Sequence, residues 1–156
     1  MVQTQRKVAD QLIQPELESL VGYNLKRAYM IVQSDFRASM GDKAMSPRVF
    51  SALSLIVQLP NLTQSDLSRQ LGIERSGLVA IVDELEGNGH VQRVQVPTDR
   101  RVQALCPTPK GIAAYHEAAK MVRAHEDRLL DVLTDAERGQ LIGLLQKIRQ
   151  KEGENE

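Results

Sequence analysis

A mainly helical fold with one small β-hairpin is predicted by three features of this 156-residue chain. Apolar residues recur at three- and four-residue steps through most of the sequence, which indicates amphipathic helices. Serine or threonine stands at several points directly before a proline or shortly before an acidic residue, and both arrangements mark helix starts. Two short apolar runs, about 90–96 and 101–105, are joined by a loop of residues 97–100 and indicate a hairpin.

The first helix is predicted to run from Pro15 to Gly41, after a polar start to the chain. Ser46 and Pro47 then predict the N-cap and first residue of a second, strongly apolar helix that Pro60 ends. The apolar positions of the first helix have helical spacing: Leu17, Leu20, Val21, Leu25, Ala28, Tyr29, Val32 and Phe36.

Two short helices joined by a tight turn are predicted next. Thr63 is the expected N-cap of the first, and Gly72 suits the sharp turn that ends it. The second runs from about Glu74 to Gly87. Such a short turn fixes a large angle between the helices, as a helix-turn-helix motif requires. The second helix has one apolar stripe: Leu78, Ile81, Val82 and Leu85.

Two further helices follow the hairpin. Thr108 and Pro109 predict the start of a long one, and Thr134 with Glu137 forms a capping box before the last. Their apolar stripes are too extensive for so small a domain to cover, so a two-fold homodimer is expected. The predicted organisation is one continuous unit with three parts: an N-terminal dimerisation helix in 1–45, a winged helix-turn-helix lobe in 46–106 and C-terminal dimerisation helices in 107–156.

Composition and motifs argue against several classes of protein. No apolar run is long enough to cross a bilayer and the N-terminus has no signal-peptide core, so no membrane association is expected. One cysteine, Cys106, cannot form an internal disulfide, which fits a cytoplasmic protein. The three histidines lack metal-site spacing, and no phosphate loop or nucleophile motif is present. Neither a cofactor, a metal nor an enzymatic activity is therefore expected.

Net charge gives no support for nucleic-acid binding. The chain has 20 Lys and Arg against 20 Asp and Glu. Residues 61–105 carry five arginines against six acidic side chains, a net charge of −1. A prediction of DNA binding must therefore depend on where the charges stand.

Placement of residues favours DNA binding. Small side chains near the start of the second short helix would let it enter a major groove, and its N-terminal dipole suits phosphates. The hairpin, or wing, carries arginines that can reach a minor groove, with Asp99 expected to orient Arg101 by an ion pair. The residues predicted to contact DNA are Thr63, Gln64, Ser65, Arg75, Ser76, Gly77, Val79, Ala80, Arg100 and Arg101.

Other interpretations remain open. Asp83 could accept a hydrogen bond from a cytosine amino group, although a solvated surface charge is the simpler interpretation. The whole module could instead mediate protein–protein assembly, with the wing as a docking surface. A salt series separates this alternative from DNA binding, because counterion release makes DNA affinity strongly salt-dependent.

Several stretches together resemble the MarR family of winged helix-turn-helix transcription regulators. The resemblance implies a two-fold dimer that binds a pseudo-palindromic operator, represses transcription, and is released by a small ligand. It also implies that Arg101 inserts into the minor groove. Ala80 departs from the family pattern, in which a larger polar or basic residue is frequent. The matching stretches are 62–67, 71–76, 82–86, 99–101, 105–111 and 133–138.

An effector pocket is predicted around the first two helices. An aromatic ring and two guanidinium groups on one helix face would suit an aromatic carboxylate or its thioester with a phosphate-rich carrier such as coenzyme A. In the simpler interpretation, Tyr29 and Phe36 belong to a dimer core and the arginines are surface charges. The predicted lining residues are Tyr23, Arg27, Met30, Ser34, Arg37, Phe50 and Ser54.

Overall fold

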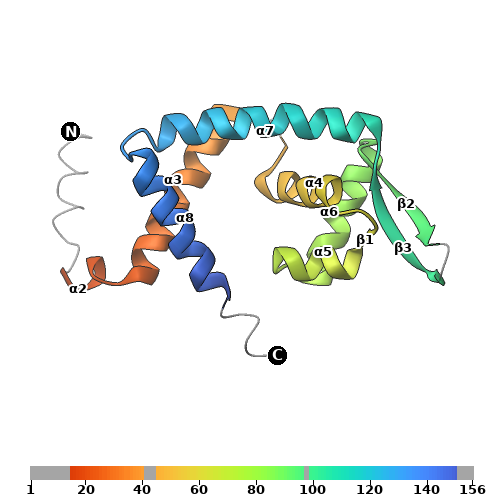
Figure 1. The fold of residues 1–156 in the computed structure, drawn as a ribbon, viewed down its shortest axis with the longest axis horizontal. Coiled ribbons are helices and arrows are strands. Elements are labelled where there is room, and N and C mark those ends of the chain that lie inside the picture. The colour runs from red at the N-terminus through yellow and green to blue at the C-terminus, as the bar shows by residue number, and fades with distance from the viewer. Residues whose placement is uncertain (1–14, 41–44, 97–98, 151–156) are drawn as a thin grey trace, which may run out of the picture. The chain divides into compact units, whose positions relative to one another are not determined.

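The computed structural model describes residues 15–40, 45–96 and 99–150, and the chain divides into two units, 1–42 and 43–156. The predicted fold class, mainly helical with a small hairpin, is confirmed (Figure 1). The elements are α2 (Pro15–Glu18), α3 (Val21–Met40), α4 (Pro47–Gln58), β1 (Leu62–Thr63), α5 (Gln64–Leu71), α6 (Arg75–Gly87), β2 (Val91–Val96), β3 (Asp99–Pro107), α7 (Pro109–Leu129) and α8 (Asp135–Arg149).

The described part of the first unit, residues 15–40, contains two helices where the sequence predicted one. The helix that begins at Pro15 is interrupted after Glu18, so the prediction of a continuous helix was wrong. At the break, two polar side chains donate hydrogen bonds to backbone carbonyls. Ser19 Oγ donates to the Glu16 carbonyl at 2.7 Å, and Asn24 Nδ2 donates to the Glu18 carbonyl at 2.7 Å. Such bonds compete with the helical ladder. The predicted end at Gly41 lies outside the described residues.

The second unit is built around one apolar core. Ser46 caps α4 as predicted, and its side chain accepts from the Val49 amide at 3.3 Å. The predicted stripe on α6 is entirely buried. Helices α4, α5 and α6 and all three strands contribute to the core, which consists of Val49, Ala52, Leu53, Ile56, Leu62, Leu67, Leu78, Ile81, Val82, Leu85, Val91 and Leu105.

The sheet has three antiparallel strands in the order β1-β3-β2, one more than predicted. Strand β1 has only two residues, Leu62 and Thr63, which pair with Leu105 and Ala104. A two-residue strand is too short for any alternation of apolar and polar residues to be visible in sequence. Strand β3 begins at Asp99, so the residues at 99 and 100 belong to the strand and not to the predicted 97–100 loop.

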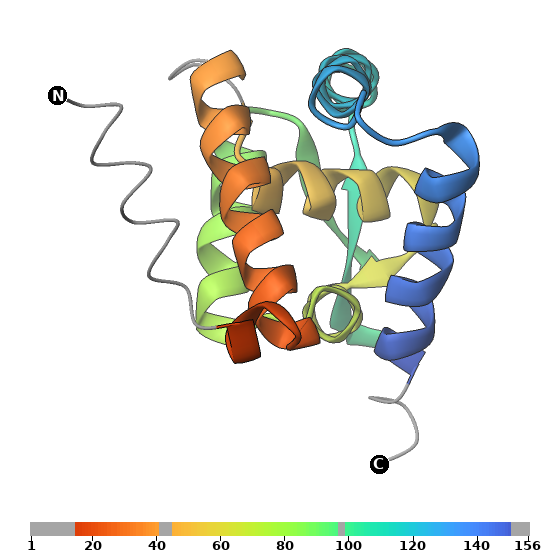
Figure 2. The ribbon, with the colours of Figure 1, turned by 90° about the vertical axis from the view of Figure 1, so that its left-hand side faces the viewer.

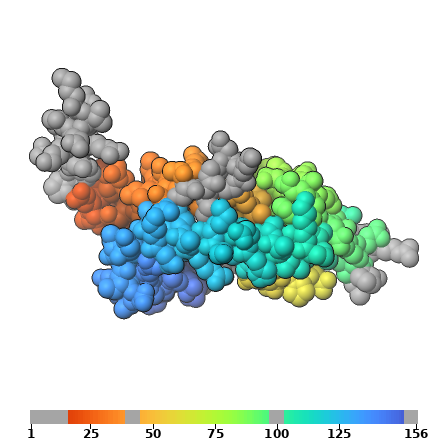
Figure 3. Space-filling model, turned by 90° about the horizontal axis from the view of Figure 1, so that it is seen from above, coloured from red at the N-terminus to blue at the C-terminus, as the bar shows by residue number. Residues whose placement is uncertain are grey.

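Helix α7 lies across the surface of the second unit, and the hairpin projects at one end of it (Figure 3). Its start is held to the base of the hairpin through Thr108, the predicted N-cap, whose hydroxyl accepts from the Gly111 amide at 3.0 Å and donates to the Gly89 carbonyl at 2.7 Å. Gly111 is buried against the backbone of His90. The beginning of α7 therefore packs directly on the chain segment that enters β2.

Helix α8 runs in a different direction from α7 (Figure 2). Arg138 fixes the corner between them by donating to the Leu130 carbonyl at 3.2 Å and to the Asp127 carboxylate at 2.9 Å. The predicted capping box of Thr134 and Glu137 is present. Helix α8 has no buried residue among those described, and four of its large apolar side chains are exposed: Leu141, Ile142, Leu144 and Ile148.

Candidate nucleic-acid interface

Helices α5 and α6 form a helix-turn-helix. Gly72 ends α5 in the left-handed conformation, with φ 60° and ψ 35°, which glycine adopts without a steric penalty. The turn is closed by the Ile73 amide, which donates to the Ser68 carbonyl at 3.1 Å, and by the Ser68 hydroxyl, which donates to the Ile73 carbonyl at 2.5 Å. The crossing of the two helices is thus fixed by the turn itself as well as by the core.

The start of α6 faces solvent. One face of the helix is buried in the core, and the predicted contact residues lie on the remaining surface. Val79 has an exposed fraction of 41%, and the small side chains at 76, 77 and 80 leave this surface without bulk. The exposed residues here are Arg75, Ser76, Gly77, Val79 and Ala80.

The start of α5 makes contacts that the sequence did not indicate. Ser65 Oγ accepts from Arg75 Nη2 at 3.3 Å, which joins the first turns of α5 and α6. The amide oxygen of Gln64, with the amide turned to face Arg93, accepts from Arg93 Nε and Nη2 at 3.2 Å. Thr63 is the N-cap of α5, as predicted. Residues 63–65, predicted as DNA contacts, therefore also fix the start of α5 and bond to the side chains of Arg75 and Arg93.

The N-cap of α5 has a charged partner. Asp66 Oδ2 accepts from the Thr63 hydroxyl at 2.5 Å and from the Thr63 amide at 3.3 Å. The hydroxyl bond lowers the pKa of the Asp66 carboxyl most, the amide bond lowers it further, and Arg69 adds a smaller effect in the same direction. The ionised carboxylate is therefore the form that stabilises this helix start.

We expect Asp66→Asn to remove a pH-dependent part of the stability. The pKa of Asp66 is lower in the folded than in the unfolded chain, so its contribution is complete above the ordinary carboxyl pKa and is lost as pH falls through the folded value. Thermal unfolding should show wild type more stable than the variant near neutral pH and the difference disappearing in acid. A difference that stays constant down to about pH 3 would contradict the assignment.

Arg93 on β2 is a functional candidate that the sequence prediction missed. Its side chain is 22% exposed and forms ion pairs with two carboxylates of α6, with Asp83 at 2.6 Å and with Glu86. Asp83 exposes 58% of its side chain, as the simpler interpretation of a solvated surface charge expects, and it is paired with Arg93. Its contact with a cytosine amino group stays a prediction. The sequence separation between Arg93 and the acidic residues of α6 gives no sign that the hairpin folds back onto that helix.

The wing consists of β2 and β3. Gln95 pairs with Gln103, but Val96 pairs with Asp99, so the register shifts near the tip and leaves residues 100–102 of β3 between two paired positions. Such irregularities re-aim a strand locally. The predicted arginines, Arg100 and Arg101, thus have their backbone at this irregularity. Their side chains, and the predicted ion pair of Asp99 with Arg101, lie outside what the structure describes.

The predicted effector residues divide between the two units. Five of them lie on α3 of the first unit: Tyr23, Arg27, Met30, Ser34 and Arg37. Phe50 and Ser54 lie on α4 of the second unit, where Phe50 stacks on Tyr115 with ring centroids 6.1 Å apart. Gln58 Nε2 donates to Ser54 Oγ at 2.8 Å and to Tyr115 Oη at 3.2 Å. An aromatic and polar surface is therefore present on α4 and α7.

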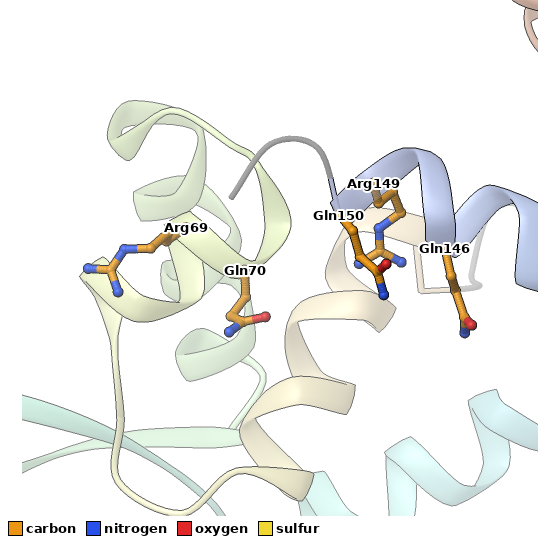
Figure 4. Close-up of a pocket in the computed structure, with 5 residues that line it drawn as sticks. All are labelled: Arg69, Gln70, Gln146, Arg149 and Gln150. Carbon is orange, nitrogen blue, oxygen red and sulfur yellow. The ribbon is translucent and has the colours of Figure 1, made fainter. Parts of the chain in front are cut away.

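A pocket of about 420 Å³ lies elsewhere, between α5 and the end of α8. In Figure 4 the side chains from α5 and those from α8 stand on separate walls, and Arg69 points away from the α8 wall. None of the seven predicted effector residues lines it. The lining residues are Arg69, Gln70, Gln146, Arg149 and Gln150.

No helix in 15–40, 45–96 or 99–150 has the length and apolar character needed to span a membrane. Within these same ranges, no three or more histidine, cysteine or acidic side chains are grouped as a metal site would require.

A helix-turn-helix followed by a projecting hairpin defines a winged helix-turn-helix protein. The profile of the MarR family matches residues 45–102, which contain the helix-turn-helix, β2 and the beginning of β3. Over 145 residues the chain is 31% identical to a protein of Thauera aromatica named "Putative transcriptional regulatory protein for hcr operon". The match covers 92% of this chain and 87% of that relative. The chain belongs to the MarR family of transcriptional regulators.

Solved structures agree with this membership. The transcriptional repressor CouR bound to a 23-mer DNA duplex is 39% identical, with a TM-score of 0.82, and the match covers 88% of this chain and 98% of that one. CouR bound to p-coumaroyl-CoA is 37% identical, with a TM-score of 0.77, and the match covers 88% and 97% of the two chains.

Proposed function

We propose that this protein is a homodimeric repressor that binds a pseudo-palindromic operator in double-stranded DNA and is released by a small aromatic carboxylate or its coenzyme A thioester. It would act in the cytoplasm, where the DNA is, and as a regulator without an enzymatic activity of its own. The single observation that carries the DNA-binding proposal is the exposed start of α6, with small side chains, next to a hairpin that holds two arginines at its tip.

Each part of this surface has a role in the proposed complex. The small residues at 76, 77 and 80 let α6 enter the major groove, and Val79 can contact a thymine methyl group. Arg75 and the amides at the start of α6 are suited to phosphates. The arginines at 100 and 101 reach the adjacent minor groove, as wing arginines can in narrow A·T-rich segments. The similarity to CouR bound to a DNA duplex supports this assignment.

A dimer explains the apolar side chains that the second unit leaves exposed. On α8, Ile142, Leu144 and Ile148 each expose more than half of their surface. Exposed apolar residues of this number mark an interaction surface. Two copies related by a two-fold axis would bury them and place two α6 helices about 34–36 Å apart, one turn of the duplex.

The effector part of the proposal is supported by chemistry and by similarity. Tyr23, Arg27 and Arg37 share one face of α3, where an aromatic ring and guanidinium groups would suit an aromatic acid or an acyl carrier with phosphates. Phe50 and Tyr115 offer a further stacking surface. CouR bound to p-coumaroyl-CoA is a relative whose ligand has this chemistry.

The proposal is tested with duplexes that the wild-type protein selects from a randomised library. Affinity for the selected duplex should fall by about 10³–10⁵-fold between about 50 and 200 mM salt, as expected for about 6–10 neutralised phosphates. Addition of p-coumaroyl-CoA or p-coumarate should release the duplex and raise the melting temperature of the protein. Failure to enrich any duplex would favour the alternative of a protein–protein assembly module.

A further inference from the structure

Arg93 stands where the wing meets the helix-turn-helix. It is the third residue of β2, and its guanidinium bonds to Asp83 and Glu86 on α6 and to Gln64 on α5. Nη1 bonds to Glu86 and Nη2 to Asp83, and Nε has the Gln64 oxygen as its acceptor when that amide is turned toward Arg93. A side chain that is 22% exposed and bonded through all three nitrogens is unsuited to a direct phosphate contact.

The same contacts alter the charge of the surface. Asp83 and Glu86 expose 58% and 40% of their side chains on the helix that is proposed to enter DNA. Unpaired carboxylates there would repel phosphates. Arg93 provides a positive partner to both, which reconciles the acidic composition of this segment with DNA binding.

Among the side chains that the structure describes, Arg93 is also the outermost one that joins the wing to the helices. Val91, at the start of β2, is buried in the core. Beyond Arg93, Val94 and Gln95 are exposed, and no side-chain hydrogen bond joins the described part of the wing tip to α5 or α6. From Arg93 to Val96 the strand extends about 10 Å at ~3.3 Å per residue, so a small rotation at position 93 becomes a larger displacement at the tip.

We infer that Arg93 is the positioning residue of the wing: together with Asp83, Glu86 and Gln64 it sets the hairpin relative to α6 so that both reach their grooves at once. The inference rests on the proposed DNA-binding function. Ion pairs whose carboxylates are exposed to solvent contribute little to stability. The effect of Arg93 is therefore expected mainly on the geometry of DNA binding and little on the fold.

The test compares five proteins on the duplex that wild type selects: wild type, Arg93→Ala, Arg93→Lys, the double variant Asp83→Asn/Glu86→Gln, and Arg93→Ala combined with the double variant. We expect Arg93→Ala to weaken binding about tenfold. The double variant should weaken it similarly, and the combination should cost no more than Arg93→Ala alone, because coupled residues are non-additive. The affinity of Arg93→Lys should lie between those of wild type and Arg93→Ala, since one ammonium group cannot bond all three partners in a fixed geometry.

A second readout separates positioning from simple stability. Hydroxyl-radical footprinting with Arg93→Ala should show lost protection of the minor groove at the wing positions. Protection of guanine N7 from methylation in the major groove should be retained, and thermal unfolding should stay close to wild type. If Arg93→Ala is too unstable to study, the double variant and Arg93→Lys give the same comparison.

The outcomes that overturn the inference differ from those that overturn the proposed function. If wild type binds the duplex and Arg93→Ala binds it with the same affinity and footprint, the inference is overturned and the proposed function stands. Retained minor-groove protection at the wing positions in the double variant also overturns it, because the wing would then be placed without the ion pairs of Arg93. A wild-type protein that selects no duplex overturns the proposed function, and the inference with it.

Discussion

Replacing Gly111 with alanine is expected to lower the free energy of unfolding by about 3 kcal/mol, the largest stability effect of any single substitution considered. A Cβ atom at this position would lie 1.9 Å from the carbonyl oxygen of His90 and 2.7 Å from its carbonyl carbon. Backbone atoms, unlike the end of a flexible side chain, cannot rotate away. The start of α7 and the entry to β2 would have to separate.

Separating the start of α7 from the entry to β2 would also break hydrogen bonds between these two segments. The His90 carbonyl accepts from the Thr108 amide at 2.9 Å, and the Thr108 hydroxyl donates to the Gly89 carbonyl at 2.7 Å. Since these groups hold the wing base and α7 together, Gly111→Ala should also disturb DNA binding. Urea unfolding, followed by circular dichroism, measures the loss.

Gly139→Ala is the matched control. Gly139 lies inside α8, and an added Cβ there meets no atom within 4 Å. Alanine is favoured over glycine in a helix interior by about 1 kcal/mol, so this variant should be slightly more stable than wild type. Equal stability of Gly111→Ala and wild type would contradict the close approach of α7 to His90.

Local signals in the sequence predicted most of the helices. Ser46, Thr63, Thr108 and Thr134 each begin a helix in the structure because a hydroxyl that accepts from an amide three residues on is a short-range interaction. Gly72 is informative for the same reason, since its left-handed conformation depends on its own backbone. These features need no knowledge of the rest of the chain.

Features that depend on distant residues were missed. Strand β1 exists only because β3 lies beside Leu62 and Thr63. The ion pairs of Arg93 form because the chain reverses after α6 and brings β2 back along it. The break after Glu18 was in principle visible, since Ser19 and Asn24 both compete for carbonyls, but such side chains also occur inside intact helices. Of the candidate site, the sequence therefore predicted the exposed residues at the start of α6, whose contact with DNA stays a prediction, and missed the side-chain contacts between α5, α6 and β2.

Arg101→Ala is expected to weaken operator binding by about 1–3 kcal/mol for each wing that inserts. The physical reason is electrostatic: a narrow A·T-rich minor groove concentrates negative potential, and a guanidinium placed in it is attracted more strongly than one on an open surface. The backbone of residue 101 lies in β3 next to the register shift, at the end of the hairpin where such an insertion is possible.

Binding is measured on two duplexes that differ only beneath the wing, one with A·T pairs in the minor groove and one with G·C pairs. Wild type should prefer the A·T duplex, and Arg101→Ala should lose more affinity for the A·T duplex than for the G·C duplex, so that the preference disappears. Arg123→Ala removes the same charge from an exposed position on α7 and should leave the preference intact. A preference that survives in Arg101→Ala would assign minor-groove recognition to another residue, because the loss of charge alone lowers the affinity for both duplexes equally.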